Sequence, residues 1–188
     1  MKRAVFLDRD GVINLDRAYV HRWEDFEFVP RALEAAARLS TAGWTVVVVT
    51  NQSGLARGYF TEEDYQALSR RKVETFAAHG APIPTVYPHH PSSRVAALAM
   101  DCDCSKPTPG MLLHATREHG LSPAESIMIG DKPSDIAAAR AAGVGRAYLV
   151  ASDNERSPTG GADEEAVGAD GAFASLADYV DHLLAHGG

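Results

Sequence analysis

The sequence predicts an α/β protein built on a doubly wound, mostly parallel sheet. Strand-like apolar runs alternate with helix-like segments along most of the 188 residues. That order is typical of a parallel sheet covered by helices on both faces. The most apolar run, Trp44–Thr50, lacks the alternation of a half-exposed strand, so we expect both of its faces to be buried.

Each expected strand is an apolar run that ends near a glycine or polar residue. The strands are Ala4–Asp8, Trp44–Thr50, Ile83–Tyr87, Ser126–Ile129, Arg146–Val150 and a short edge strand ending at Phe173.

Each expected helix begins at a capping residue or a proline and carries apolar residues at helical spacing. Thr61 with Asp64 three residues later predicts an N-terminal cap. The helices are Pro30–Ala42, Thr61–His79, Thr108–His119, Pro133–Ala142 and Ser175–Ala185.

The remaining segments are expected to be loops within one domain that spans residues 1–188. Val12–Val29 has no sustained period and is expected to be a long ordered loop, and Asn51–Gly54 a turn. Pro88–Pro109 is expected to be irregular. The region 152–171 is rich in Gly, Asp, Glu, Ser and Pro, which is typical of a mobile surface loop. No stretch is long enough for a large cap domain.

The composition is that of an ordinary globular protein, with 45% apolar and 23% charged residues. A net charge of −7 opposes binding to nucleic acid or an anionic membrane. The N-terminus shows no signal peptide, and the apolar runs are too short to span a bilayer. Cys102 and Cys104 are separated by one residue and are poor disulfide partners. We therefore expect a cytoplasmic protein, and a monomer or weak dimer because no coiled-coil pattern occurs.

Several chemically useful residues come where strands are expected to end. Asp8 and Asp10 are two residues apart, so on a continuing strand they would share a face. Thr50 and Asp131 also follow strands, and Lys106 precedes a helix. Ligands of doubly wound sheets bind outside the carboxyl ends of the strands, so these residues are expected to line one mouth.

This set of residues suits phosphoryl transfer. One carboxylate can attack phosphorus, and a second can protonate the leaving alkoxide and later activate water. A third carboxylate helps to bind Mg²⁺, which offsets the repulsion between carboxylate and phosphate. A hydroxyl and an ammonium group can hold the phosphoryl oxygens.

The sequence also resembles the haloacid dehalogenase superfamily of phosphatases over about Val5–Val150. Within it, the sequence is most similar to the D-glycero-D-manno-heptose 1,7-bisphosphate phosphatases and the related histidinol-phosphate phosphatases. The four matching motifs, in the family's order, are Phe6–Asn14, Thr50–Gly54, Lys106-Pro107, and Gly130-Asp131-Lys132 with Asp135.

The resemblance implies a role for each motif residue. Asp8 is the implied nucleophile, and Asp10 the general acid/base, whose main-chain carbonyl also binds Mg²⁺. Asp131 is the remaining protein ligand of Mg²⁺, and Thr50 and Lys106 hold the transferring phosphoryl group. Asp135 is expected to support the motif loop rather than touch metal. The implied substrate-binding residues are Asp16, Arg17, Ala18, Tyr19, Asn51, Gln52, Ser53 and Lys132.

One departure from the family concerns substrate recognition. Ser105 occupies the position of a family arginine that precedes the motif lysine, so a bidentate phosphate donor is missing. Arg57, Arg9, Arg17 or Lys132 could compensate, although each could be an ordinary surface residue, as we expect for Arg17. The resemblance favours hydrolysis of the 7-phosphate of the heptose bisphosphate. The alternatives are another small sugar phosphate, histidinol phosphate, or an inactive binding module.

A second departure concerns a structural zinc site. The heptose branch carries the pattern Cys-x-His…Cys-x-Cys. Here Tyr87 replaces the first cysteine, while His89, Cys102 and Cys104 match the other ligands. We expect a weakened zinc clip in the loop of about 87–105. Its fourth ligand would be His90, Asp101, Asp103 or water. The alternative is a degenerate site whose loop is held by packing.

Overall fold

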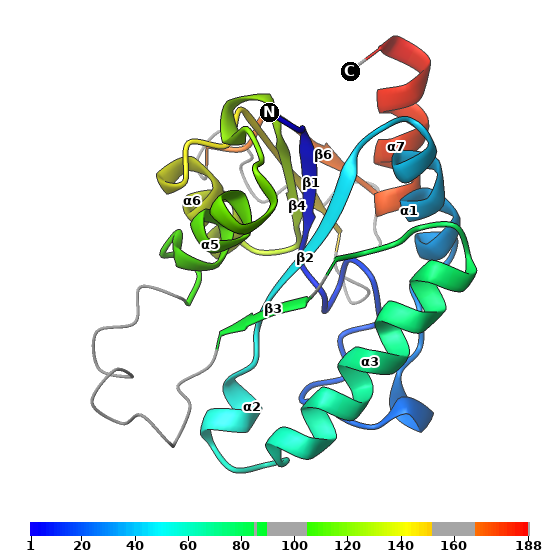
Figure 1. Cartoon of the computed structure of the whole chain (residues 1–188), viewed down its shortest axis with the longest axis vertical. Helices are drawn as coiled ribbons and strands as arrows, with labels where there is room; N and C mark the ends of the chain where they lie inside the picture. Colours follow the sequence, from blue (N-terminus) through cyan, green and yellow to red (C-terminus); the bar gives the residue numbers. More distant parts are fainter. Residues whose placement is uncertain (85, 90–104, 152–167, 188) are drawn as a thin grey trace.

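Six parallel strands form one sheet with the order β3-β2-β1-β4-β5-β6 (Figure 1). The computed structural model of the chain describes residues 1–84, 86–89, 105–151 and 168–187. The predicted α/β class and parallel sheet are thus confirmed. The strands are β1 (Ala4–Leu7), β2 (Thr45–Asn51), β3 (Val86–His89), β4 (Ile127–Gly130), β5 (Arg146–Val150) and β6 (Ala172–Phe173).

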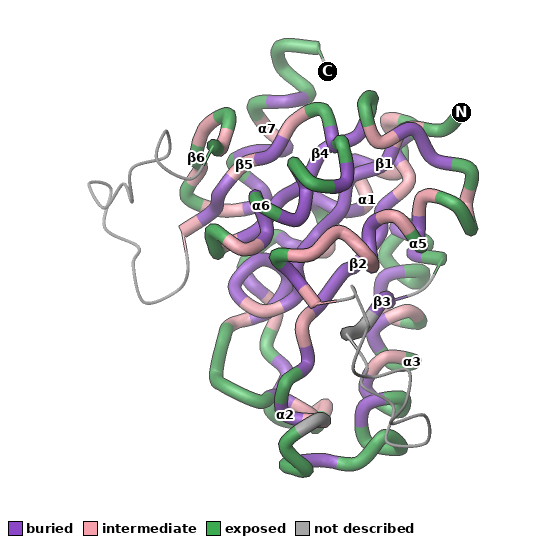
Figure 2. The backbone as a smooth tube through the Cα atoms, turned by 90° about the vertical axis from the view of Figure 1, so that its left-hand side faces the viewer, coloured by how far each residue is buried: buried purple, intermediate pink, exposed green. Residues whose placement is uncertain are grey.

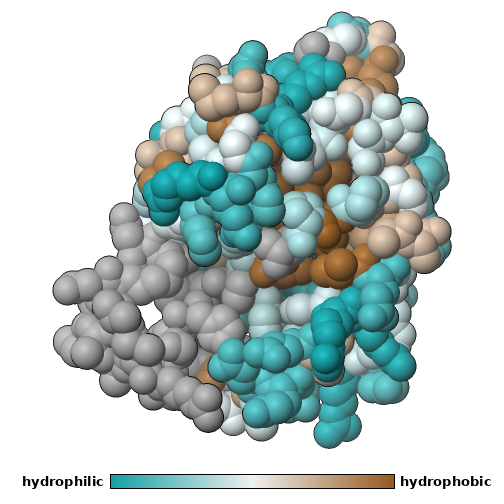
Figure 3. All heavy atoms as spheres, viewed as in Figure 1, coloured by the Kyte–Doolittle hydropathy of each residue, from teal (hydrophilic) through white to brown (hydrophobic). Residues whose placement is uncertain are grey.

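Helices cover both faces of the sheet (Figure 1). On one face lie α1 (Ala32–Thr41), α3 (Glu62–Ala78) and α7 (Leu176–His186). On the other lie α5 (Gly110–His119) and α6 (Pro133–Ala141). Hydrophilic residues cover the outer side of α3 (Figure 3). None of the helices in these described ranges has the length and apolar character that a bilayer-spanning helix needs. The short elements are α2 (Ser53–Ala56) and the 3-10 helices Trp23–Asp25 and Pro123–Glu125.

The core is divided into two layers by the alternation of side chains along each strand. In β1, Val5 and Leu7 pack with residues of α1, α3 and α7. Ala4 and Phe6 pack with residues of α5 and α6. The same alternation holds in β2, and the centre of the sheet is buried throughout (Figure 2). Successive side chains of a strand point to opposite faces, so a strand covered on both faces reads as continuously apolar.

Three local predictions need correction. The third strand begins at Val86 rather than Ile83. Pro84 lacks an amide hydrogen for the ladder, whereas Pro88 is tolerated because β3 is an edge strand. The expected turn at Asn51–Gly54 instead extends β2 by one residue and then forms α2. The first helix begins at Ala32 rather than Pro30, because Arg31 has a left-handed φ of 63°.

Other local predictions are confirmed. Thr61 and Asp64 form the reciprocal capping box of α3, and Ser175 caps α7. The segment from Val12 to Val29 is an ordered loop, with Asn14 bridging to Asp10 and Phe28. Two stretches lie outside the described residues: 152–167 of the expected loop and 90–104 of the expected zinc clip.

The strand order reverses between β1 and β4, which is the topological switch point of the sheet. The chain leaves β1 towards α1 on one face of the sheet, and it leaves β4 into α6 on the other face. Neighbouring strands whose connections diverge in this way leave an opening at their carboxyl ends. Asp8 and Asp131, the residues that follow these strands, therefore lie at the switch point.

Candidate active site

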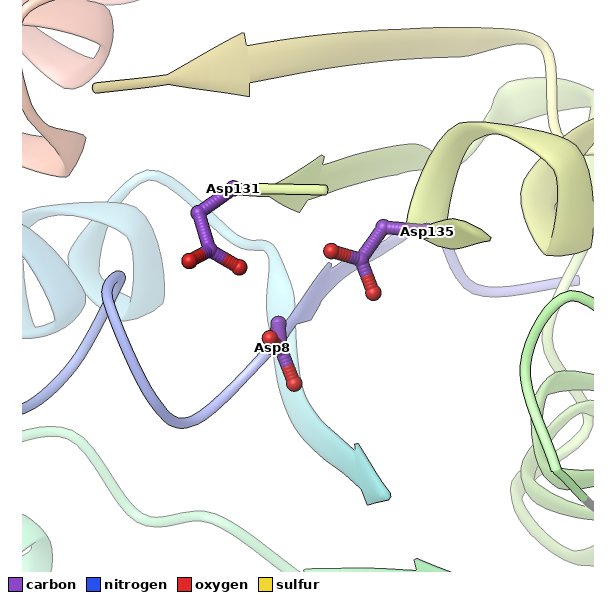
Figure 4. A group of neighbouring side chains, drawn as sticks. All are labelled: Asp8, Asp131 and Asp135. Carbon is purple, nitrogen blue, oxygen red and sulfur yellow. The ribbon is translucent and has the colours of Figure 1, made fainter. Parts of the chain in front are cut away.

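Three carboxylates meet at the carboxyl ends of β1 and β4. One oxygen each of Asp8, Asp131 and Asp135 lies within 4.8 Å of the other two (Figure 4). Asp8 continues β1, Asp131 continues β4, and Asp135 lies in the first turn of α6. Carboxylate oxygens are the ligands that Mg²⁺ prefers, so this cluster could hold a divalent cation. In addition, Asp131 Oδ1 is buried and has no hydrogen-bond partner among the described residues.

Gly11 makes room for Asp131. Its φ is +86°, and a Cβ at this position would lie 2.3 Å from Asp131 Oδ2. Any side chain would therefore displace the carboxylate. The glycine that ends the first motif is thus required by the position of an acid 120 residues further along the chain.

Lys106 is the cation that holds two of these acids together. Its Nζ lies 2.7 Å from Asp8 Oδ1 and 2.6 Å from Asp135 Oδ1, and it also donates to the Val49 carbonyl at 3.1 Å. Lys106 is only 5% exposed. Asp135 also accepts a hydrogen bond from the Lys132 main-chain N–H (3.0 Å), so it supports the motif loop as predicted. Its contact with Lys106 was not predicted.

The electrostatics of the cluster favour a bound cation. Burial raises the pKa of Asp8 to about 6, although Lys106 opposes the shift. Burial and the neighbouring Asp8 raise the pKa of Asp131 to about 8. The ammonium of Lys106 has a raised pKa because Asp8 and Asp135 outweigh its burial. The acids thus carry more negative charge than Lys106 alone compensates, and a divalent cation would relieve their repulsion.

Asp10 has a different environment from Asp8. Its carboxylate accepts two hydrogen bonds from the Arg9 guanidinium (2.9 and 3.0 Å) and one from Asn14 Nδ2 (3.0 Å). Burial would raise the pKa of Asp10, but Arg9 and Asn14 outweigh burial and hold it below its usual value. Arg9 is only 1% exposed and also donates to the Val20 carbonyl. Arg9 is therefore not an ordinary surface residue, and the hypothesis that it compensates for Ser105 stays a prediction.

The residues that follow β2 form the adjacent wall. Thr50 is fully buried, and its Oγ1 lies 2.7 Å from the amide of Gln52. The Gln52 amide oxygen can accept from this hydroxyl and from Arg9 (3.2 and 3.3 Å). The Asn51 side chain forms two hydrogen bonds with the Lys106 main chain, at 2.9 and 3.0 Å. These contacts give Asn51 a positioning role towards Lys106, and the expectation that Asn51 also lines the substrate site stays a prediction.

Two contacts link predicted substrate residues to one another, Asp16 with Lys132 and Tyr19 with Arg57. Lys132 Nζ is 3.4 Å from Asp16 Oδ2, and the Asp16 carboxylate accepts from the Ala18 N–H at 3.2 Å. Ser53 is exposed and Ser105 is half-buried, and the Ser105 carbonyl accepts from Thr108. Arg17 pairs with Glu27 in an exposed salt bridge, as expected for an ordinary surface residue. Arg57 donates to the Tyr19 hydroxyl at 2.9 Å.

Tyr87 points towards α5 rather than into an open loop. Its hydroxyl lies 2.6 Å from both Glu118 Oε2 and His119 Nε2, and the residue is 6% exposed. Tyr87 is thus occupied by hydrogen bonds and is not a free ligand for the predicted zinc site. Of the expected ligands, Cys102 and Cys104 lie outside the described residues. Only the main chain of His89, the last residue of β3, is described.

Two residues of the site were not predicted from the sequence. Asn14 orients Asp10 from four positions along the chain; it ends the first motif, Phe6–Asn14, but no role was predicted for it. Lys72 is buried in α3, and its ammonium lies about 6 Å from the rings of Phe26 and Tyr65. A signal for Lys72 existed, because it lies on the same helical face as the buried residues Tyr65, Leu68 and Phe76.

Comparisons with known proteins identify the family of the chain. A family model described as HAD-hyrolase-like, where HAD abbreviates haloacid dehalogenase, matches residues 103–179. The D-glycero-β-D-manno-heptose-1,7-bisphosphate 7-phosphatase of Vibrio cholerae is 47% identical over 151 residues, which cover 79% of this chain and 81% of the relative. The enzyme of that name from Yersinia pestis is 42% identical over 184 residues, covering 97% and 95%.

A solved structure extends the likeness to the whole fold. D,D-heptose 1,7-bisphosphate phosphatase from B. bronchiseptica, complexed with magnesium and phosphate, matches with a TM-score of 0.79 and 33% identity over 100% of both chains. The fold is that of haloacid dehalogenase-like hydrolases. Within that class, the chain belongs to the family of D-glycero-β-D-manno-heptose-1,7-bisphosphate 7-phosphatases, as its identity to the relatives shows.

Proposed function

We propose that this protein is a Mg²⁺-dependent phosphomonoesterase that removes the 7-phosphate of D-glycero-D-manno-heptose 1,7-bisphosphate. The observation that carries the proposal is the meeting of Asp8, Asp131 and Asp135 with Lys106 at the ends of β1 and β4. The names of the relatives support the substrate, and the magnesium and phosphate in the related solved structure support the metal and the reaction class.

In the proposed reaction, a carboxylate oxygen of Asp8 forms a bond to phosphorus while the ester P–O bond breaks. Asp10 gives its proton to the departing sugar oxygen and later takes a proton from the water that hydrolyses the aspartyl-phosphate. Lys106 and Thr50 hold the phosphoryl oxygens. Mg²⁺ bound by Asp8, Asp131 and the Asp10 carbonyl would neutralise charge between carboxylate and phosphate.

Asp10 must be protonated when the leaving oxygen departs, yet Arg9 and Asn14 favour its charged form. The incoming phosphate adds negative charge beside Asp10, and this charge favours protonation. We therefore expect Asp10 to become protonated when the substrate binds.

Replacing Asp8 by asparagine tests the nucleophile. The substitution keeps the side-chain shape but removes the attacking oxygen anion, so phosphate release should fall by at least about a thousandfold. Asp25→Asn, which changes an exposed aspartate of the 3-10 helix Trp23–Asp25, is the matched control. Retention of wild-type turnover by the Asp8→Asn variant, with an unchanged circular dichroism spectrum, would sink the assignment.

The substrate is tested by comparing kcat/KM for heptose bisphosphate, histidinol phosphate and a panel of other phosphorylated metabolites. We expect the heptose bisphosphate to be hydrolysed with the highest kcat/KM. A higher kcat/KM for histidinol phosphate would reverse this order. Activity should disappear with EDTA and return with Mg²⁺, whereas an inactive binding module would release no phosphate under either condition.

Structural zinc, the domain organisation and the cellular setting remain predictions. We expect one catalytic domain over residues 1–188 that acts as a cytoplasmic monomer on a small phosphorylated metabolite, without nucleic acid or membrane partners. Zinc bound through His89, Cys102 and Cys104 should appear at one equivalent in metal analysis of untagged protein. A protein without stoichiometric zinc would instead favour the degenerate site held by packing.

A further inference from the structure

A hydrogen-bonded group at the edge of the sheet takes no part in the proposed reaction steps. Tyr87 of β3 places its hydroxyl 2.6 Å from both Glu118 Oε2 and His119 Nε2, which belong to the last turn of α5. We call these three residues the tyrosine latch. Tyr87 stands where the heptose branch has its first zinc cysteine, so the latch comes from this chain's own residues and not from the family pattern.

The hydrogens of the tyrosine latch follow from its geometry. A separation of 2.6 Å is typical of a hydroxyl that donates to a charged carboxylate, so the single hydroxyl hydrogen of Tyr87 points to Glu118. The hydroxyl oxygen can then only accept from His119, whose Nε2 must carry a hydrogen. Burial and Glu118 both raise the pKa of Tyr87, so the hydroxyl keeps its proton. The latch is therefore a chain of two hydrogen bonds that joins β3 to α5.

The ring of Tyr87 continues this contact into the core. It lies edge to face with the ring of His114 on α5, with centroids 5.4 Å apart. The residue is buried in the layer between the sheet and α5, together with Val47, Val49, Met111, Leu112 and Ala115. Tyr87 thus fixes α5 against the sheet through its ring and, at the last turn of the helix, through its hydroxyl.

The tyrosine latch adjoins the structures that set the place of Lys106. In the parallel ladder, Tyr87 is the partner of Val49, whose carbonyl accepts from Lys106 Nζ at 3.1 Å. Lys106 is followed by a turn in which the Thr108 N–H and hydroxyl both donate to the Ser105 carbonyl, and α5 begins two residues later. Lys106 is therefore held between the end of β2 and the start of α5, and the latch ties α5 to the strand beside β2.

We propose that Tyr87 is a positioning residue that acts on Lys106 through α5. Its bonds to Glu118 and His119 hold this helix against β3, and the turn before the helix carries Lys106. The proposal rests on the proposed function, in which the Lys106 ammonium holds the reacting phosphate. A misplacement of about 1 Å near a reacting centre can cost about a hundredfold in rate, so a smaller shift of α5 is enough to lower kcat.

The test removes the hydroxyl of Tyr87 and keeps its ring. Tyr87→Phe should lower kcat for phosphate release by about threefold to tenfold and leave KM nearly unchanged. Tyr148→Phe makes the same change at a half-buried tyrosine of β5, in the other half of the sheet, and is the matched control. Glu118→Gln keeps an acceptor for the hydroxyl and should retain most of the wild-type kcat. The double variant Glu118→Ala/His119→Ala should behave like Tyr87→Phe, and adding Tyr87→Phe to it should change little, because the three residues act as a unit.

Hydrogen exchange supplies a measurement that does not depend on activity. The Lys106 N–H donates to Asn51 Oδ1 at 3.0 Å, and the Asp8 N–H donates to the Ile129 carbonyl at 3.0 Å inside the sheet. In Tyr87→Phe, the Lys106 amide should exchange at least about tenfold faster, while the Asp8 amide should keep its wild-type rate. A general loss of stability would instead accelerate both amides.

The proposal requires a lower kcat together with faster exchange at Lys106 alone. A Tyr87→Phe variant that shows only one of these changes, or neither, overturns it. An increase in KM without a fall in kcat overturns it as well, and so does equal acceleration of the Lys106 and Asp8 amides. If the wild-type protein releases no phosphate from any ester with Mg²⁺, the proposed function fails, and the exchange rate at Lys106 then decides by itself whether Tyr87 positions this residue.

Discussion

Replacing Asn51 by alanine should lower both the stability and the kcat of this protein, because Asn51 holds the main chain of Lys106. The Asn51 side chain donates to the Lys106 carbonyl and accepts from its N–H, at 2.9 and 3.0 Å. Lys106 in turn places its ammonium between Asp8 and Asp135. Asn51 therefore acts on the acid cluster through Lys106.

The expected size of the effect follows from the two lost hydrogen bonds. Each contributes about 1 kcal/mol net, so Asn51→Ala should lower the free energy of unfolding by about 2 kcal/mol. For a protein of this size, that loss corresponds to a decrease in Tm of about 4–8 °C. A displaced Lys106 should also lower kcat by about tenfold to a hundredfold, because small misplacements at a reacting centre are costly.

Differential scanning calorimetry and steady-state kinetics measure the two effects separately. Asn51→Asp keeps the shape but turns a donor into an oxygen that faces the Lys106 carbonyl, so its Tm should fall at least as far as that of the alanine variant. Gln66→Ala removes an amide from the exposed side of α3 and should leave Tm nearly unchanged. A wild-type Tm combined with an increase in KM alone would refute the positioning role and restore Asn51 as a substrate contact.

Three further predictions concern the metal and the core. Gly11→Ala would place a methyl group 2.3 Å from Asp131 Oδ2. The affinity of the variant for Mg²⁺, measured by calorimetry, should therefore fall at least about tenfold, and a variant that binds Mg²⁺ as tightly as the wild-type protein would contradict this. Because Asp8 and Asp131 have pKa values raised to about 6 and about 8, Mg²⁺ must displace protons, and its apparent affinity should rise with pH across that range. A pH-independent affinity would argue against these ligands. Burial lowers the pKa of Lys72, so protonation favours the unfolded state below the unfolded pKa of 10.5. Lys72→Met should therefore raise the free energy of unfolding at pH 7 by about 1 kcal/mol or more, and this gain should shrink as pH rises towards 10.5. If the Lys72→Met variant had a lower Tm than the wild-type protein at pH 7, the buried amine would not be destabilising.

Much of the architecture was predictable because burial leaves a clear pattern in the chain. Trp44–Thr50 reads as continuously apolar, and β2 is covered by helices on both faces. The Thr61–Asp64 box marks the start of α3 in both the sequence and the structure. Predictions failed where a local preference was weak, as at Asn51–Gly54, where packing of Gly54 against Tyr19 and Phe60 accompanies a short helix instead of a turn.

The sequence by itself determined the fold class and the motif residues, because strand ends in a parallel sheet fall on a common edge and the chemistry of carboxylates, hydroxyl and ammonium is written in the residue types. Only the tertiary structure decided how these groups are paired. It assigned Asp135 to Lys106, Arg9 to Asp10 and Asn51 to the Lys106 main chain. Lys106 is far along the chain from both Asn51 and Asp135, so its pairings are set by the packing of the elements that bear these residues. Arg9 and Asp10 are neighbours in the sequence, but neighbouring side chains of a chain can point in different directions, so the structure was needed to show that they pair.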